Sequence, residues 1–256
     1  MAKASALGMR VIVVYGSRGD AGETNADLGG ESLGDRRQRE ATLACDALGV
    51  GRIEWLPYLD SGMSGTPTTG HPDAFTNASL DTATRQLAEL LNDETISAVI
   101  GYDRNGTYGH PDHIQVHRLA HHAARTLGAD WVLDATYSRE YLATLGDGDG
   151  DGDGDASNAE GEADNGNALD LSFASAEAEL THFVAGDEWV DAKLAAIAHH
   201  LSQIPDDWDT EKPDTEGFRA RFGTEWYIAT AISEASDFSA LEPLFAPKSR
   251  FTAPIA

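Results

Sequence analysis

Cysteine, lysine and long apolar runs are all scarce in this chain of 256 residues. A single cysteine, Cys45, excludes a framework of disulfides within the chain. No run of 18 apolar residues occurs, and the first residues lack the basic-then-apolar pattern of a secretory signal. We therefore expect a soluble cytoplasmic protein in which Cys45 is a small buried side chain.

Positive charge is the next shortage. The chain has 18 basic and 43 acidic residues and a formal net charge of −25. Binding to nucleic acid or to an anionic membrane depends on basic side chains, so we expect neither partner. An acidic surface with few lysines suits a high-salt cytoplasm, where salt screens self-repulsion. An ordinary acidic protein with an acidic insert explains the same composition, and oligomeric state is not predicted.

Short apolar runs alternate with helical patterns through the first half of the chain. Strands are predicted at residues 10–15, 52–56, 96–100 and 131–135, the first and third of them buried, and helices begin near Asp35, Ser79 and Ile114. This alternation predicts an α/β fold with a mainly parallel sheet flanked by helices, within a single domain over residues 1–256. Residues 181–184 favour another strand. Periodicity does not decide between a strand and a buried helix at residues 226–229.

An acidic insert interrupts this pattern at residues 146–167. Its Gly-Asp repeats contain almost no large apolar side chain, so burial cannot offset the entropy of ordering them. We expect this insert to be disordered. A calcium loop is disfavoured, because the strict alternation lacks the ligand positions and the closing Glu of an EF-hand.

The stretch Gly-Thr-Tyr-Gly-His-Pro-Asp-His, residues 106–113, stands between a predicted strand and a predicted helix. Open α/β sheets bind ligands beyond the carboxyl ends of their strands. Pro111 restricts the turn, and Asp112 is expected to cap the following helix. His110 and His113 flank the turn and can converge on one point, as zinc-binding histidines do. A capped helix with two solvated histidines is the alternative.

Several segments together resemble the PIG-L/LmbE-like zinc-dependent N-deacetylases, including members that act on glucosaminyl-inositol and mycothiol-type substrates. The segments are residues 11–23, 37–40, 48–50, 60–65, 108–113 and 196–203. The most specific is Tyr-Gly-His-Pro-Asp-His at 108–113. The resemblance implies a Rossmann-like layered fold, and hydrolysis of the N-acetyl group of an amino-sugar substrate by zinc-activated water.

The resemblance also implies roles for individual residues. His113 would be a zinc ligand and His110 would stabilise the oxyanion. Asp112 would tune a histidine, and Tyr108 would line the site and contact the transition state. These four residues belong to the most specific of the matching segments.

Two further residues match positions that bind the substrate in the family. Arg37 and Asp60 would hold sugar or inositol hydroxyls, which leaves open whether the small-molecule substrate is a glucosaminyl-inositol, a thiol conjugate or another acetylated amino sugar. His200 lies in a family-like segment and is expected only to pack near the site.

One family motif is missing from these 256 residues. Family members carry an N-terminal His-Pro-Asp-Asp that supplies two zinc ligands and the general base, and no such motif occurs here. With His113 as the remaining ligand, we expect weak zinc binding and poor deacetylation unless another chain supplies ligands. A start codon placed too far downstream or a truncated gene is the expected cause. The alternative is a non-catalytic relative that binds a sugar-like ligand or a partner protein.

Two replacements for the missing ligands are conceivable. His71-Pro72-Asp73 repeats part of the motif, although a surface turn is the favoured explanation. His113, His117 and His121 recur every four residues and would share one helical face, where His113 and His117 could bind zinc. A partly exposed helix face is the simpler explanation of that spacing.

Overall fold

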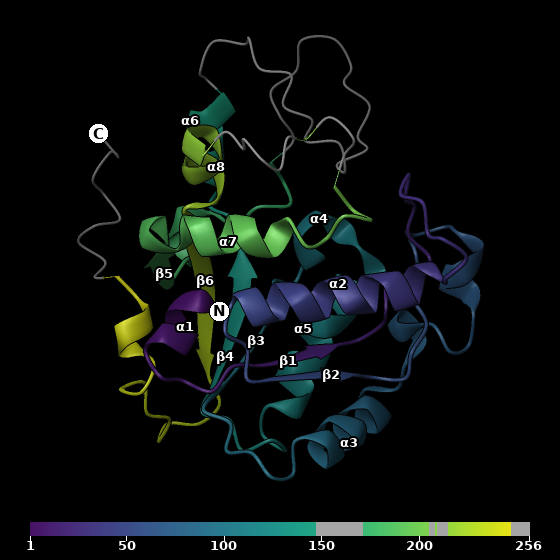
Figure 1. Ribbon diagram of the computed structural model, residues 1–256. Coiled ribbons are helices and arrows are strands. Elements are labelled where there is room, and N and C mark those ends of the chain that lie inside the picture. The colour runs from purple at the N-terminus through teal and green to yellow at the C-terminus, as the bar shows by residue number, and fades with distance from the viewer. Residues whose placement is uncertain (147–170, 205–207, 209–214, 247–256) are drawn as a thin grey trace.

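The computed structural model describes residues 1–146, 171–204, 208 and 215–246. Figure 1 shows helices packed around strands, with α2 and α7 in front of the strands and in contact with each other. The α-helices are α1 (Ala2–Ala6), α2 (Leu33–Ala47), α3 (Leu80–Leu90), α4 (Gly106–Gly109), α5 (Pro111–Ala123), α6 (Arg139–Gly146), α7 (Val190–Ile197) and α8 (Thr215–Phe222).

The described strands form two sheets. The strands are β1 (Ile12–Tyr15), β2 (Arg52–Trp55), β3 (Ala98–Tyr102), β4 (Trp131–Thr136), β5 (His182–Ala185) and β6 (Thr224–Ala231). Strands β1 and β2 pair in parallel, and the second sheet has the order β3-β4-β6-β5. In it, β3 and β4 are parallel, whereas β6 is antiparallel to both of its neighbours. The predicted α/β fold with parallel pairs flanked by helices is confirmed, and the ambiguous stretch at 226–229 is a strand.

Two predicted strands are less buried than expected. All four residues of β1 are only half-buried, and Ile100 of β3 is 57% exposed. In the described part of the chain, β1 pairs only with β2 and β3 only with β4, so both are edge strands. The prediction of buried strands was wrong here because a β-branched run does not reveal how many neighbours a strand will have.

One helix cap differs from the prediction, and a second helix begins two residues earlier than the predicted Asp35. The N-cap of α2 is Ser32, whose hydroxyl accepts from the backbone N–H of Asp35 at 3.0 Å. The N-cap of α5 is His110, whose Nδ1 accepts from the backbone N–H of Asp112 at 3.1 Å. Asp112 therefore does not cap its helix. Pro111 occupies the first helical position, where its missing N–H costs nothing, and this places the cap at His110, two residues before Asp112.

Helix α5 is held by apolar contacts on two sides. Its residues Leu119 and Ala123 join a buried cluster with Leu56, Phe75 and Leu87, which links α5 to β2 and α3. Residues Ala120 and Ala124 pack instead against Val132 of β4. This double packing fixes the position of α5, and therefore of the motif at its N-terminus.

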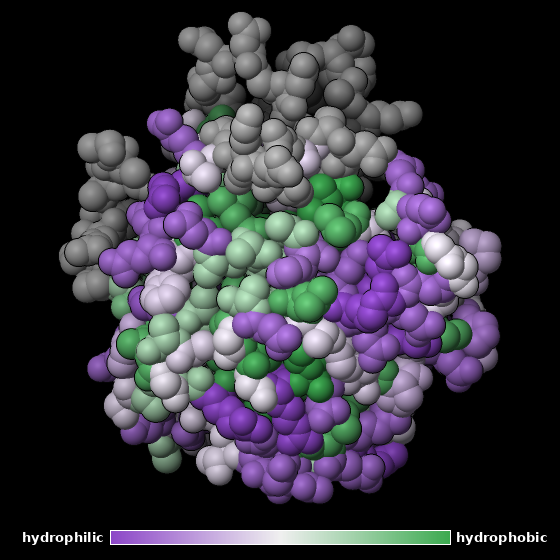
Figure 2. Space-filling model, in the orientation of Figure 1, coloured by the Kyte–Doolittle hydropathy of each residue, from purple (hydrophilic) through white to green (hydrophobic). Residues whose placement is uncertain are grey.

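Some further predictions from the composition can be compared with the structure, and one predicted segment lies outside the described residues. Cys45 is buried in α2, as expected. Hydrophilic residues cover the region around α3 in Figure 2, in keeping with the acidic sequence. No helix of the described residues is long and apolar enough to span a membrane. The predicted insert at 146–167 lies, apart from Gly146, outside the described residues.

Candidate functional site

The loop between β3 and α5 is held by Asp103, which is almost fully buried. One carboxylate oxygen of Asp103 accepts from the backbone N–H groups of Asn105 and Thr107, at 3.0 and 3.1 Å. The other oxygen accepts from the hydroxyl of Thr136 at 2.6 Å. Thr107 has a φ of +63°, the one positive value at a non-glycine residue in the described chain. Strained backbone of this kind clusters at ligand sites, and Asp103 holds it in place.

The aromatic rings of the motif converge after this loop. The ring centroid of His113 lies 5.1 Å from that of His110 and 5.1 Å from that of Tyr108. The ring of Tyr102, at the end of β3, stacks on His113 with centroids 3.9 Å apart. The rings of His110 and His113 thus lie close together, and their convergence on one ligand stays a prediction.

The surroundings of His113 favour the neutral form of its ring. Its Nδ1 lies 3.2 Å from the carbonyl oxygen of Gly106, to which it donates when the proton is on that nitrogen. This tautomer leaves the lone pair of Nε2 free for a metal. Burial, with a smaller effect from His110, lowers the pKa of His113 to about 4. His113 is therefore uncharged at neutral pH, as a metal ligand must be.

Asp112 links three segments through its carboxylate. It accepts from the backbone N–H of Ser61 at 3.2 Å, from the hydroxyl of Ser61, and from the hydroxyl of Ser17 at 3.4 Å. Burial raises the pKa of Asp112, while the hydrogen bonds from Ser61 act in the opposite direction. Sequence reasoning missed Ser61 and Ser17. The sequence indicates these two serines only by their position in polar loops that follow predicted strands.

Asp60 and Arg37 organise the loop that follows β1. Asp60 is buried and accepts from the backbone N–H groups of Ala21 at 3.2 Å and Gly62 at 2.9 Å. Arg37 of α2 donates to the carbonyl oxygens of Gly19 at 2.6 Å and Glu23 at 3.2 Å. Burial lowers the pKa of Arg37, and the nearby negative charge of Asp60 opposes that shift.

The six predicted site residues come together. Asp60 is close enough to act electrostatically on Arg37, Tyr108, Asp112 and His113. Arg37 acts likewise on Tyr108. The loops after β1, β2 and β3 therefore meet at one place. The roles of these residues in chemistry stay predictions.

The other predicted histidines are placed differently. His71 lies in an exposed turn, where its Nδ1 accepts from the backbone N–H of Asp73. His200 is close enough to interact electrostatically with Glu40 and Arg37, and burial lowers its pKa. His117 contacts Asp134 on β4 instead of joining His113.

We tested whether the residues around His113 fit a zinc ion. A catalytic zinc normally has three protein ligands. Among the described residues, one group of three His, Cys, Asp or Glu side chains brings ligand atoms within 4.8 Å of one another, and it consists of His117, His121 and Asp134. His113 is not part of it. The described residues therefore offer His113 as a single ligand and do not complete a zinc site around it.

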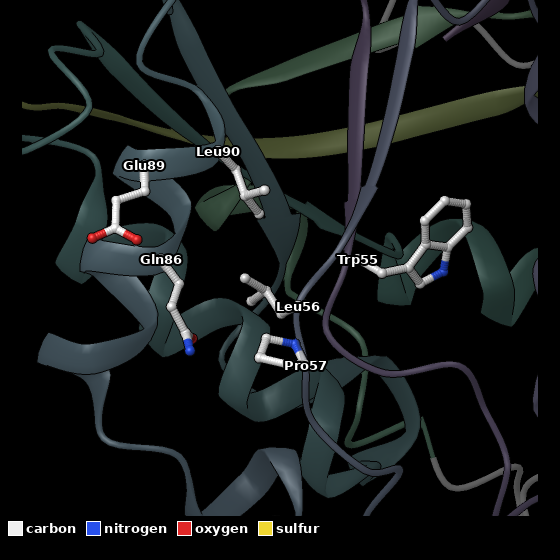
Figure 3. Close-up of a pocket in the computed structure, with 6 residues that line it drawn as sticks. All are labelled: Trp55, Leu56, Pro57, Gln86, Glu89 and Leu90. Atoms are coloured by element: carbon white, nitrogen blue, oxygen red, sulfur yellow. The ribbon is translucent and has the colours of Figure 1, made fainter.

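A pocket elsewhere on the molecule lies between β2 and α3. Figure 3 shows the residues that line it: Trp55, Leu56, Pro57, Gln86, Glu89 and Leu90. None of the six predicted site residues contributes to its wall, so this pocket is separate from the candidate site.

Comparison with known proteins identifies relatives of the first half of the chain. Residues 1–124 match the family model described as PIG-L, GlcNAc-PI de-N-acetylase. Over 130 residues the chain is 45% identical to the 1D-myo-inositol 2-acetamido-2-deoxy-alpha-D-glucopyranoside deacetylase of Acidothermus cellulolyticus, which covers 46% of this chain and 44% of the relative. The enzyme of the same name from Thermobifida fusca is 40% identical over 130 residues, with 46% of each chain covered. The chain thus spans about half the length of the curated relatives it matches.

Solved structures show the same fold. The N,N'-diacetylchitobiose deacetylase of Pyrococcus horikoshii superposes with a TM-score of 0.56 at 20% identity, covering 94% of this chain and 80% of that one. A zinc-inhibited form of teicoplanin deacetylase superposes with a TM-score of 0.52 at 15% identity, covering 91% and 92%. The resemblance found in the sequence is therefore confirmed for the first half of the chain: residues 1–124 are similar to the PIG-L de-N-acetylases.

Proposed function

We propose that this protein is an N-deacetylase that hydrolyses the acetamide of a small amino-sugar substrate. The observation that carries the proposal is the meeting of the loops after β1, β2 and β3, where hydrogen bonds join Arg37 to Gly19, Ala21 to Asp60, and Ser61 to Asp112. The named activities of the sequence relatives, which are deacetylases of an acetamido sugar linked to inositol, support it. The net charge of −25 argues against a nucleic acid or an anionic membrane as the substrate.

Asp60 and Arg37 are suited to bind sugar hydroxyls. A carboxylate has about four lone-pair positions, and Asp60 uses two of them for the backbone N–H groups of Ala21 and Gly62. The remaining positions can accept from hydroxyl groups. Arg37 keeps the Gly19 loop in place beside Asp60 and supplies positive charge there.

His110 is suited to stabilise the oxyanion of the tetrahedral intermediate. Its Nδ1 accepts from the backbone N–H of Asp112, so the proton of the neutral ring is on Nε2. An Nε2–H donor of fixed orientation can donate to the oxygen that becomes negative as water attacks the amide. Loss of one such donor slows comparable enzymes by about 100- to 1000-fold.

The nucleophile is the part of the reaction that the described residues do not complete. When bound, zinc lowers the pKa of its water to about 7 and so supplies hydroxide at neutral pH. His113, neutral and with Nε2 free, fits one ligand position. The described residues bring no second and third ligand to His113.

A second function is favoured by that incomplete ligand set: a non-catalytic protein that binds a sugar-like ligand. The two functions make different predictions for one experiment. The full chain is incubated with N-acetylglucosaminyl-inositol and zinc chloride, and both acetate release and substrate binding are measured.

Acetate release that falls at least about 100-fold in His110→Ala supports the deacetylase. His71→Ala, which changes an exposed turn, is the matched control and is expected to keep full activity. Binding without release, weakened by Asp60→Asn, supports the non-catalytic function. If the substrate neither binds nor reacts, the proposed site is wrong.

A further inference from the structure

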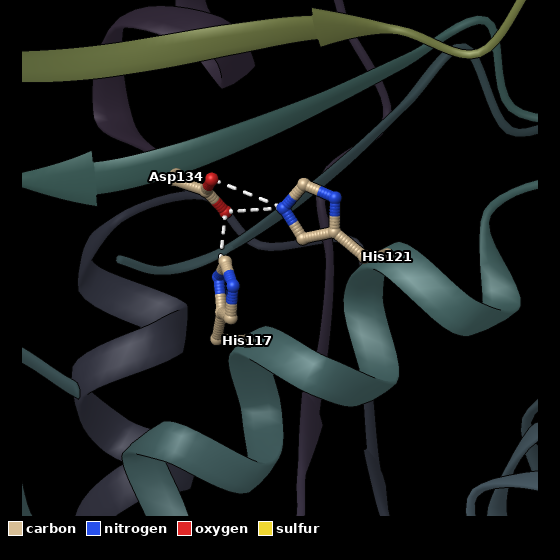
Figure 4. Close-up of side chains that lie close together, drawn as sticks. All are labelled: His117, His121 and Asp134. Atoms are coloured by element: carbon tan, nitrogen blue, oxygen red, sulfur yellow. Dashed lines mark hydrogen bonds and ion pairs between the residues drawn. The ribbon is translucent and has the colours of Figure 1, made fainter. Parts of the chain in front are cut away.

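A second cluster of potential ligands lies on α5, one turn beyond His113. His117 and His121 point from the helix towards Asp134 of β4, and Figure 4 shows both rings directed at its carboxylate. The Nδ1 of His117 lies 3.2 Å from Oδ1 of Asp134. The Nε2 of His121 lies 3.0 Å from each carboxylate oxygen.

The sequence places these three residues together through a close contact of helix and sheet. His117 and His121 are four residues apart and share a helix face. Gly101 of β3 lies against this helix, and a Cβ at Gly101 would come within 3.2 Å of the Cβ of Ala120. The missing side chain allows α5 to approach the sheet closely enough for both rings to reach Asp134.

The electrostatic surroundings of the cluster are acidic. The charged groups that act on His117 are Asp134 and Asp103, and both favour a positive charge on its ring. Burial raises the pKa of Asp134, but hydrogen bonds from His117 and His121 outweigh burial and hold that pKa below its usual value. The Asp134 side chain is only 9% exposed, so water hydrates its carboxylate poorly. A cation bound at this carboxylate would neutralise its negative charge.

We propose that His117, His121 and Asp134 bind a divalent transition-metal ion of the zinc class. Zinc binds histidine nitrogen at about 2.0–2.1 Å and carboxylate oxygen at about 2.0–2.2 Å, so tetrahedral ligand atoms lie about 3.4 Å apart. The contacts of 3.0 and 3.2 Å to Asp134 are close to this separation. All three ligand atoms lie within 4.8 Å of one another. Small side-chain movements therefore suffice to admit the ion.

The site has an accessible side and a competing hydrogen bond. The His121 side chain is 32% exposed, which leaves a route for the ion and a fourth position for water. The Nδ1 of His117 also lies 3.1 Å from the carbonyl oxygen of Tyr102. Without metal, a proton on Nδ1 is shared between this carbonyl and Asp134. The ion replaces that proton and joins α5 to β4 across 17 residues of sequence.

The proposal is tested with the full chain, stripped of metal by a chelator and then titrated with zinc chloride. Calorimetry gives the affinity, elemental analysis after dialysis gives the bound zinc, and thermal unfolding gives the shift in Tm. We expect one zinc per chain at this site and a Tm that rises with zinc concentration, because the ion binds the folded state. Cobalt provides a spectroscopic check, since tetrahedral coordination gives intense visible absorption.

Variants assign the zinc to the cluster. His121→Gln and Asp134→Asn are expected to weaken zinc binding at least about tenfold and to remove the Tm shift. His121 is partly exposed, so its variant decides the matter if Asp134→Asn fails to fold. His122→Gln is the matched control, because His122 is the next residue of the same helix and contacts Thr84 and Asp81 instead. It is expected to bind zinc normally.

A separate control distinguishes this cluster from the candidate site. His113→Ala removes the ligand implied by the family resemblance and is expected to leave zinc binding at the cluster unchanged. Zinc binding that is lost in His113→Ala but kept in His121→Gln overturns the proposal. So does a wild-type chain that binds no zinc. Neither result depends on whether the protein releases acetate.

Discussion

Replacing Ser61 by alanine tests how Asp112 is held in the candidate site. The Ser61 side chain is fully buried, and its hydroxyl donates to the carboxylate of Asp112 and accepts from the backbone N–H of Thr76 at 2.9 Å. A hydrogen bond to a charged group contributes about 1.5–3 kcal/mol, and a buried donor left without a partner costs about 1–3 kcal/mol. We expect Ser61→Ala to lower the free energy of unfolding by about 2–4 kcal/mol at pH 7.

The loss should depend on pH. Burial raises the pKa of folded Asp112 above its unfolded value, so the folded state holds the proton more tightly and stability falls as pH rises through that interval. The donors of Ser61 limit this fall by stabilising the charged form. Without the hydroxyl the fall is larger. The variant should therefore lose most stability at neutral pH and less in acid, where Asp112 is protonated.

Urea unfolding of both proteins between pH 7 and pH 3 measures the effect. Ser17→Ala is the matched control, since its hydroxyl lies 3.4 Å from Asp112 and contributes a weaker hydrogen bond. An equal loss at every pH would refute the assignment of a charge-stabilising role to Ser61. A loss of less than about 0.5 kcal/mol, the usual limit for an unimportant surface position, would refute the hydrogen bonds themselves.

Three further predictions use other parts of the structure. His113 should titrate near pH 4 in an NMR experiment. Because its pKa is lower in the folded than in the unfolded chain, the free energy of unfolding should decrease as pH falls from about 6.5 towards that value. A titration near the usual pKa of histidine would contradict the burial of the ring. Gly106→Ala should lower the free energy of unfolding by more than about 1 kcal/mol, because φ at Gly106 is +62° and the added Cβ would lie 2.8 Å from the backbone nitrogen of Ile114. Denaturant unfolding measures the loss, and Gly70→Ala is the control, because there is open space around Gly70. Molar potassium chloride should raise Tm by screening a net charge of −25, and an unchanged Tm would rule out adaptation to high salt.

The sequence predicted those features that depend on local pattern. The alternation of strands and helices up to residue 135 was correct, and the loops after β1, β2 and β3 do meet. Parallel pairing explains the meeting of the loops after β1 and β2, because parallel strands end at the same edge of a sheet. Strand β3 belongs to the other sheet, and the chain that follows it joins them through the hydrogen bond between Ser61 and Asp112. The helix from Pro111 was also predicted, although its cap was assigned to Asp112 instead of His110.

Features that depend on distant contacts were not predictable. Ser61 contacts Asp112 across 51 residues of sequence, and no local pattern indicates that pair. The spacing of His117 and His121 was noticed, but their partner Asp134 appeared only as part of a strand. The antiparallel pairing of β6 with β4 likewise depends on a neighbour more than 90 residues away, which the composition of β6 alone does not reveal.

The hydrogen bonds around Asp103 have a consequence for the acidic Gly-Asp segment. Thr136, which donates to Asp103, also shares a hydrogen bond of 2.9 Å with Ser175, beyond that segment. The backbone of Ser175 bonds to Tyr137 at 3.0 Å and to Arg139 at 2.9 Å. The residues on either side of the segment are thus hydrogen-bonded to each other and, through Asp103, to the loop between β3 and α5. The chain between the flanks can therefore become longer or shorter without shifting the histidines, and we expect its length to vary among related proteins.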